Sequence, residues 1–149
     1  MIRIKAVDAQ NILDVCELTY GDGCAAPAPD GRFHCNALSI AETKFDPEMH
    51  PNAIYSNNMP IGFFMYKRPE AQAETAVIYR FMLGSKYRDR GLEAKALEHV
   101  LKGLKIQGVK KVSLMAGECD KDTKNLCLSF GFHPAGETGK EQLCYELEM

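Results

Sequence analysis

The sequence predicts an α/β protein in which helices cover both faces of a mixed β-sheet. Its apolar patterns follow the order βααββ–βαβαββ along 149 residues. In the middle of this order, a buried strand at 76–83 leads through a basic turn at 84–91 into a helix at 91–106. A strand that returns to its sheet through a helix pairs in parallel, whereas a hairpin pairs antiparallel. A sheet with both kinds of pairing carries helices on its faces.

The N-terminal half alternates short strands with amphipathic helices. Apolar residues recur on one side of each expected helix, and the second helix ends at Asp46-Pro47. The cluster from Ser56 to Pro60 is rich in turn-forming residues and connects two β-rich runs. The expected elements are strand 2–7, helix 9–20, a loop at 21–31, helix 35–45, and a hairpin of strands 52–55 and 61–66.

The C-terminal half begins with the long strand 76–83 and its crossover helix. Ala94, Leu97, Leu101 and Leu104 recur at spacings of three and four in this helix, and Gly108 ends it. The remaining expected elements are a β-rich run at 111–116, helix 120–130, and strands at 132–136 and 141–148 joined by a turn at 136–139.

Length and composition predict one domain over residues 1–149. The chain has 46% hydrophobic and 26% charged residues, which is ordinary for a globular protein with a buried core. No apolar run is long enough to cross a bilayer, and strand-like alternation begins directly at Met1, so we expect a cytoplasmic protein without a membrane partner. A net charge of −2 gives no reason to expect nucleic acid binding.

The charge distribution differs between the two halves. Residues 1–75 carry six Lys or Arg against ten Asp or Glu, a net charge of −4, and residues 76–149 carry twelve against ten, a net charge of +2. An acidic half suits a cationic substrate and a basic half suits an anionic cofactor, although a chance imbalance of this size is about as common.

The six cysteines predict neither disulfides nor a metal site. They form no Cys-x-x-Cys pair, so reduced thiols are expected. Cys24, His34 and Cys35 could contribute to a zinc site, but no second ligand pair follows at a suitable spacing. We therefore expect no metal.

The basic turn before helix 91–106 is a candidate anion site. A Gly-containing turn that opens a helix presents unpaired backbone N–H groups at the positive end of the helix dipole. Many α/β proteins have such turns, so the feature alone is a weak indication of phosphate binding.

Several motifs in matching order resemble the GNAT acetyltransferase superfamily over roughly residues 1–135. Arg88-x-x-Gly91 resembles its pyrophosphate loop, and Leu126 to Phe132 resembles its Leu-Tyr-x-x-x-Gly-Phe helix end. The segments Phe33 to Glu42, Pro60 to Tyr66 and Tyr79 to Leu83 are similar to the diamine/spermidine N-acetyltransferase branch. The resemblance implies a GNAT-like fold, a central mixed sheet flanked by helices, and acetyl-CoA as co-substrate.

The resemblance also implies the residues that would bind acetyl-CoA. In the family, the fourth strand splays from its neighbour at a bulge and its backbone binds the pantetheine arm, which corresponds here to Phe81, Met82 and Leu83. Lys95 would add positive charge near the diphosphate, and Asp120 aligns with a pantetheine-contacting Asn, though it could equally cap the helix. The pyrophosphate would lie on the segment formed by Arg88, Asp89, Arg90, Gly91, Leu92, Glu93 and Ala94.

Glu93 departs from the family pattern, which has Gly or Ala at this position. Its carboxylate brings bulk and like charge to the diphosphate. Either it stabilises the first helical turn and occupies the anion site itself, or it turns to solvent while Arg88 or Arg90 neutralises it.

Cys127 departs in the same way, because the family has a Tyr there that protonates the CoA thiolate. A thiol is a weaker donor on a shorter side chain. Cys127 is thus either a proton donor or a small apolar residue on a buried helix face.

Amine acetylation requires a base that removes a proton from the amine. Glu42, Asp46 and Glu48 lie near the end of the second helix, which borders the acceptor site in the family. They are candidate carboxylates for a polyamine or an N-terminal amine, and Glu42 is the candidate catalytic carboxylate. A solvated charged face is the alternative interpretation.

The resemblance implies an N-acetyltransferase that acts on a primary amine of a small, polyamine-like molecule by direct attack. The alternative functions are a degenerate domain that binds acyl-CoA or another ligand as a sensor, and a protein-interaction domain. Exposed strand residues at 141–148 could pair two chains, so a homodimer is a further expectation.

Overall fold

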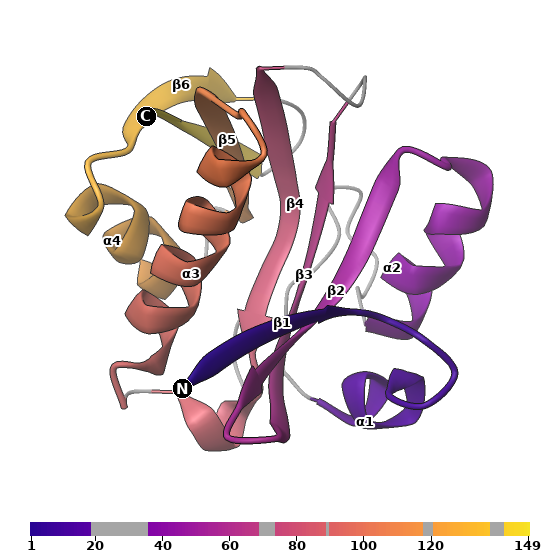
Figure 1. Ribbon diagram of the computed structural model, residues 1–149. Helices are drawn as coiled ribbons and strands as arrows, with labels where there is room; N and C mark the ends of the chain where they lie inside the picture. Colours follow the sequence, from indigo (N-terminus) through magenta and orange to yellow (C-terminus); the bar gives the residue numbers. More distant parts are fainter. Residues whose placement is uncertain (19–35, 69–73, 89, 118–120, 138–141) are drawn as a thin grey trace.

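A seven-stranded mixed sheet forms the centre of the molecule in the computed structural model (Figure 1). The structure describes residues 1–18, 36–68, 74–88, 90–117, 121–137 and 142–149. The strand order is β1-β2-β3-β4-β5-β7-β6. The β4–β5 pair is parallel and the other neighbours are antiparallel, which confirms the predicted mixed sheet.

The N-terminal elements are β1 (Ile2–Ala6), α1 (Ile12–Glu17), α2 (Asn36–Glu42) and the 3-10 helix η1 (Thr43–Phe45). The expected helix 9–20 is shorter in the structure. Asp8 accepts hydrogen bonds from the backbone N–H groups of Gln10 and Asn11 and forms the turn before α1. At the other end Leu18 has extended backbone, so the helix ends before it.

The hairpin of β2 (Met49–Ser56) and β3 (Met59–Lys67) is longer than expected. Its turn consists of Asn57 and Asn58, both with positive φ of 50° and 73°. Asparagine tolerates this conformation, and two positive φ values in a two-residue turn match the twist of the flanking strands. The predicted turn cluster is therefore confirmed, but the strands extend into both of its ends.

The C-terminal elements follow the predicted order. They are β4 (Thr75–Leu83), the 3-10 helix η2 (Ser85–Tyr87), α3 (Leu92–Ile106), β5 (Lys111–Gly117), α4 (Lys121–Ser129), β6 (His133–Glu137) and β7 (Gln142–Glu148).

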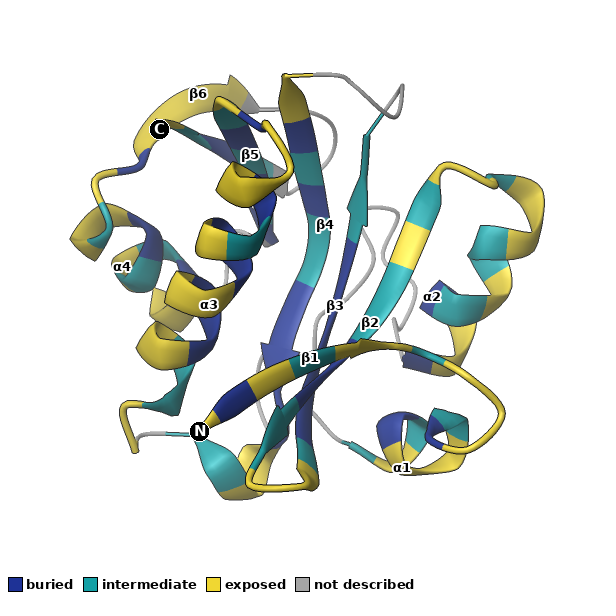
Figure 2. Ribbon diagram, viewed as in Figure 1, coloured by how far each residue is buried: buried dark blue, intermediate teal, exposed yellow. Residues whose placement is uncertain are grey.

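Helices cover both faces of the sheet, as predicted (Figures 1 and 2). On one face, α3 and α4 pack on a large apolar cluster that includes Ile78 and Phe81 of β4. On the other face, α1 and α2 lie over a smaller cluster of Val15, Ala53, Phe63, Met65 and Met82. The inward side of α3 is buried at Ala96, Leu97, Val100, Leu101 and Leu104. The burial of these residues explains their spacing in the sequence.

The strand at the C-terminus is not an exposed edge, which corrects the basis given for a homodimer. β7 pairs with β5 on one side and with β6 on the other. The edges of the sheet are β1 and β6. Hydrogen bonds on both sides of β7 leave it no free edge for a second chain. No helix in the described ranges is long and apolar enough to span a bilayer.

Candidate functional site

The candidate site begins where two parallel strands separate. β4 and β5 pair from Thr75–Lys111 to Ile78–Leu114, and within the described residues the pairing then stops. β4 continues to Leu83, and β5 continues to Gly117 along β7. A split therefore opens between the C-terminal halves of two central strands, and their backbone groups can accept a ligand there.

The other side of β4 is held firmly by β3. The register between the two strands shifts between Met65 and Tyr66, which leaves Tyr79 as an extra residue in β4. Beyond this bulge, an ideal Cβ on Gly62 would lie 2.4 Å from the backbone oxygen of Met82. Only glycine permits this close approach of the two backbones. The end of β4 therefore stays against β3, on the side away from β5.

A shallow pocket lies at the split, with about 290 Å³ of free space when the open solvent at its mouth is included. Three elements contribute to it: the end of β4, the start of α3 and the first turns of α4. The lining residues are Phe81, Met82, Leu83, Arg88, Glu93, Asp122, Thr123 and Leu126. The structure thus brings together five residues predicted from the sequence: Phe81, Met82, Leu83, Arg88 and Glu93.

The N-terminus of α3 opens beside this pocket. Gly91 is its N-cap residue with a φ of 74°, and no side chain caps the helix. A residue with a Cβ rarely adopts this backbone conformation. The first N–H groups of α3 lack a capping side chain, as expected for an anion-binding turn. The predicted cofactor residues Arg90, Gly91 and Ala94 are exposed here.

Arg88 and Asp122 form an ion pair across the pocket. Arg88 donates to the Asp122 carboxylate over 2.7 Å, with side chains 21% and 69% exposed respectively. The pair joins the turn before α3 to the first turn of α4. Together with Glu93, the lining has two carboxylates and one guanidinium, so a diphosphate would compete with Asp122 for Arg88.

Cys127 is fully buried in the apolar cluster under α4 and does not line the pocket. Its neighbours on the helix, Thr123 and Leu126, do. The family motif singled out Cys127 as a candidate site residue. The sequence did not predict that Asp122, Thr123 and Leu126 line the pocket. Positions 123 and 126 are three residues apart and so share a helix face, a signal that could have identified them.

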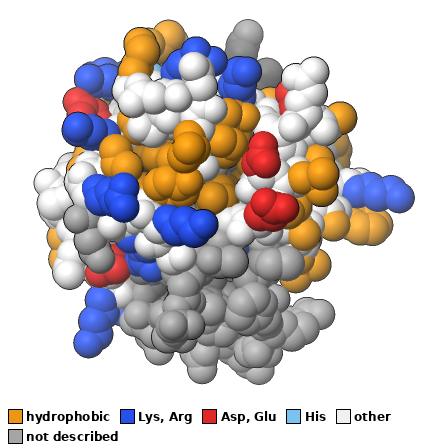
Figure 3. Space-filling model, turned by 90° about the horizontal axis from the view of Figure 1, so that it is seen from below, with side chains coloured by type: hydrophobic (Ala, Val, Ile, Leu, Met, Phe, Trp, Pro, Cys, Tyr) orange, Lys and Arg blue, Asp and Glu red, His pale blue; other side chains and the backbone are white. Residues whose placement is uncertain are grey.

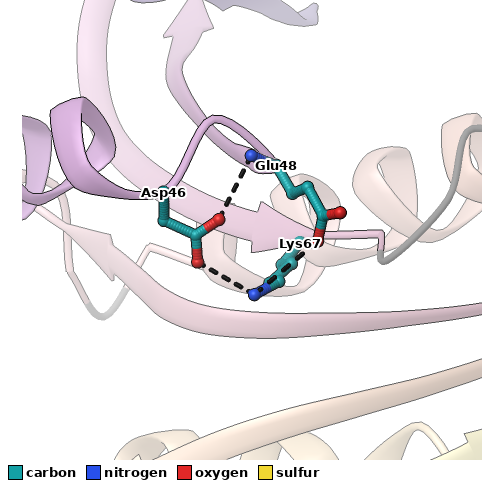
Figure 4. A network of polar contacts seen from close by, with 3 residues as sticks. All are labelled: Asp46, Glu48 and Lys67. Carbon is teal, nitrogen blue, oxygen red and sulfur yellow. Dashed lines mark hydrogen bonds and ion pairs between the residues drawn. The ribbon is translucent and has the colours of Figure 1, made fainter.

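Two of the three acidic residues predicted to face the acceptor, Asp46 and Glu48, form ion pairs with Lys67 (Figure 4). Lys67 Nζ lies 2.9 Å from Asp46 Oδ2 and 3.7 Å from Glu48 Oε2. The hydrogen bond from Lys67 lowers the pKa of Asp46, and the same bond raises the pKa of Lys67. This network attaches the segment after η1 to the end of β3.

Glu42 lies at the end of α2, and its charge acts on Arg80 of β4. Burial lowers the pKa of the Arg80 guanidinium, and the negative charge of Glu42 opposes that shift. The Arg80 guanidinium also donates to the carbonyl oxygen of Tyr79 over 2.8 Å. Glu42 is therefore within electrostatic range of the Arg80 guanidinium.

Figure 3 views the molecule from below and shows a group of apolar side chains with Lys and Arg side chains on its left and Asp and Glu side chains on its right. Two predicted cofactor residues, Asp89 and Asp120, lie outside the described residues, as do Cys24, His34 and Cys35. In the parts of the chain that the structure describes, no group of three His, Cys, Asp or Glu residues could hold a metal ion.

The split strands and the glycine-opened helix are accompanied by a sequence match. The sequence model of the acetyltransferase (GNAT) family matches residues 16–132. The chain belongs to the GNAT family. No curated protein matches it.

Solved structures of several acetyltransferases share the fold of this GNAT chain. An acetyltransferase from Thermus thermophilus is 18% identical with a TM-score of 0.75, covering 100% of this chain and 97% of its own. PaiA N-acetyltransferase from Thermoplasma acidophilum, in complex with coenzyme A, is 13% identical with a TM-score of 0.69, covering 100% and 99%. A GNAT acetyltransferase from Elizabethkingia anophelis with acetyl-CoA bound is 17% identical with a TM-score of 0.67, covering 99% and 98%.

Proposed function

We propose that this GNAT chain transfers the acetyl group of acetyl-CoA to a primary amine of a small molecule. The observation that carries the proposal is the split between β4 and β5, with the uncapped N-terminus of α3 beside it. The backbone of a strand at such a split suits the amides of a pantetheine arm, and a helix N-terminus suits a diphosphate. Relatives of this fold have been solved with coenzyme A and with acetyl-CoA bound.

The residues of the pocket fit the parts of acetyl-CoA. Phe81, Met82 and Leu83 supply strand backbone and apolar side chains along the split. Arg88 supplies a cation, and the exposed Arg90 and Lys95 lie on either side of Gly91 in the sequence. The N–H donors of the helix start and these cations would hold the diphosphate and offset the charge of Glu93.

The reaction we propose is direct attack of the amine on the thioester. The nitrogen lone pair forms the new C–N bond, the C–S bond breaks, and the thiolate leaves and takes up a proton. The amine loses a proton to a base, for which Glu42 is our candidate. A backbone N–H near Met82 or Leu83 would stabilise the developing oxyanion.

A polyamine-like acceptor is the finer part of the proposal. It is based on Glu42, Asp46 and Glu48. Since Lys67 is paired with Asp46 and Glu48, a cationic acceptor would have to displace Lys67 to use them. A small monoamine that approaches Glu42 needs no such displacement, so the acceptor panel must include both kinds.

Calorimetric titration with acetyl-CoA, with CoA and a buffer blank as controls, is the first test. Micromolar binding followed by release of free CoA with a member of the amine panel is the expected result. No detectable heat, together with an unchanged melting temperature at millimolar ligand, would overturn the enzyme proposal.

A second candidate function is an acyl-CoA binder without efficient turnover. The burial of Cys127 favours it, because the residue at the family's proton-donor position does not reach the pocket. In that case calorimetry would show binding, and no amine in the panel would release CoA.

A further inference from the structure

We propose that Met82, held in place by Asn36, limits the length of the acyl group that the site accepts. This inference rests on the proposed function and deepens it, since it assigns a specificity-determining residue. It starts from Met82, which is part of both the pocket lining and an apolar cluster. Met82 lines the pocket at the split, and it also belongs to the apolar cluster under α1 and α2.

The charged part of the pocket and Met82 belong to different layers of the molecule. Arg88 and Glu93 lie at the start of α3, which packs on one face of the sheet. Met82 packs with Val15 and Phe63 on the opposite face and is only 8% exposed. A thioester that passes between β4 and β5 from the α3 side therefore points its acyl group toward Met82.

Asn36 fixes the Met82 side chain from the α2 side. Asn36 is the buried first residue of α2, and its side-chain Nδ2 donates to the backbone oxygen of Val15 over 2.9 Å. The same Nδ2 lies 3.7 Å from the sulfur of Met82. One amide thus ties α1, α2 and the end of β4 together. Methionine is flexible, so this contact selects one of its side-chain positions.

A fixed methionine behind the split limits chain length sterically. An acetyl group ends in one methyl group, and each further methylene must displace atoms of a close-packed region. If the Met82 side chain is shortened to a methyl group, the space it leaves can hold about two extra methylenes. Each methylene buried there gains affinity of about fourfold.

The first experiment compares dissociation constants of CoA, acetyl-CoA and butyryl-CoA for the whole protein and for Met82→Ala. We expect the wild type to bind acetyl-CoA about tenfold or more tightly than butyryl-CoA, and Met82→Ala to bring that ratio to about one or below. CoA itself has no acyl group, so its dissociation constant for each variant is the reference that separates an effect on the acyl group from an effect on the rest of the ligand.

Met65→Ala is the matched control. Met65 is a fully buried methionine of the same cluster, located on β3, and it does not line the pocket. It reproduces the loss of packing without altering the acyl site. We expect its ratio of acetyl-CoA to butyryl-CoA affinity to match the wild type.

The second comparison tests the role of Asn36. Asn36→Leu keeps the size of the side chain and removes the amide, so Met82 gains freedom and the ratio should fall by about threefold or more. The control is Asn11→Leu, which removes another buried amide at the start of α1, one that donates to Ala6 and not to Met82.

The outcomes separate this inference from the proposed function. If the wild type binds none of the three ligands, both are overturned. Equal wild-type affinity for acetyl-CoA and butyryl-CoA overturns only the inference. It also fails if Met82→Ala leaves the ratio unchanged, or if Met65→Ala shifts it as much.

Discussion

At the scale of single residues, Arg88 has two competing partners. In the structure its guanidinium contacts Asp122 at 2.7 Å. In the proposed complex it contacts the diphosphate of acetyl-CoA. An exposed ion pair is weak, and a diphosphate offers more charge and more acceptor oxygens than one carboxylate. The ligand should therefore displace Asp122, and Asp122 should reduce the observed affinity.

We predict that Asp122→Asn strengthens acetyl-CoA binding by about three- to tenfold, measured by calorimetry. The substitution removes the carboxylate that competes with the diphosphate for Arg88, and with it one negative charge of the pocket. Glu98→Gln is the control, because Glu98 forms an exposed ion pair with Lys102 elsewhere on α3. Unchanged or weaker binding by Asp122→Asn would show that the ion pair supports the ligand rather than competing with it.

Cys127 allows a clear distinction between packing and proton donation. Because it is fully buried, we predict that Cys127→Ala changes kcat by less than about twofold and lowers the free energy of unfolding by about 1 kcal/mol. A proton donor would instead lose about a hundredfold or more in kcat. Urea denaturation and steady-state kinetics on the same samples separate the two roles.

At the scale of elements, the start of α3 depends on one backbone conformation. Gly91 has a φ of 74°, and a Cβ placed on it would meet no atom within 4 Å. The cost of a side chain there is therefore conformational strain and not a clash.

We predict that Gly91→Ala lowers the free energy of unfolding by about 1–2 kcal/mol in urea denaturation. Gly103→Ala is the matched control in the same helix. Its added Cβ also meets no atom within 4 Å and its φ is not positive, so alanine there should raise stability by about 0.5–1 kcal/mol. Equal effects of the two substitutions would contradict the argument from φ.

The Asp46–Lys67 pair makes the attachment of the segment after η1 to the end of β3 dependent on pH. The hydrogen bond from Lys67 lowers the pKa of Asp46 below its ordinary value of 3.8. The stabilising contribution of this carboxylate is therefore present above that value and is lost as the pH falls through the lowered pKa. On the basic side, the raised pKa of Lys67 means that its contribution is lost only as the pH rises through that raised value.

We predict that Asp46→Asn lowers the melting temperature near pH 7, and that this difference shrinks as the pH falls below 3.8 and through the lowered pKa of Asp46. Differential scanning calorimetry across the acidic range measures it. Asp14→Asn, at an exposed aspartate on α1, is the control and should show a smaller difference at neutral pH. A difference that persists at low pH would mean that the Asn variant disturbs something other than the ion pair.

At the scale of the whole molecule, the two faces of the sheet are unequal. Among the described residues, the cluster under α3 and α4 contains most of the buried apolar side chains, while the cluster under α1 and α2 has five. The buried residues of α2 are themselves polar, Asn36 and Ser39. Local stability follows buried apolar contact, so the α1/α2 layer should open at lower free energy than the rest.

We predict that backbone amides of α2 exchange with deuterium faster than those of the central part of α3, measured by mass spectrometry under native conditions. Bound acetyl-CoA should slow exchange at the start of α3. Equal protection of α2 and α3 would indicate that the α1/α2 layer unfolds with the whole molecule. A homodimer stays a proposal; it would have to form through β1, β6 or a helical face, and sedimentation velocity tests it.

Much of this arrangement could be predicted from the sequence. The spacing of Leu97, Leu101 and Leu104 identified α3, and the glycine turn identified the start of the pocket. The Arg88–Asp122 contact joins residues 34 positions apart, and no periodic pattern encodes it. Long-range pairing also decided that β7 lies inside the sheet. Such features depend on tertiary packing, which local patterns do not contain.

The extra residue in β4 has a further consequence. Side chains of a regular strand alternate between its two faces, and Ile78 faces the α3 side. With strict alternation through Tyr79, Phe81 would face the α1 side and Met82 the α3 side. The bulge absorbs one residue and reverses the phase, so that Phe81 packs with Ile78 while Met82 lies on the opposite face. Whether Met82 lies on the face where we propose that the acyl group ends is thus decided by whether the number of residues between Ile78 and Met82 is odd or even.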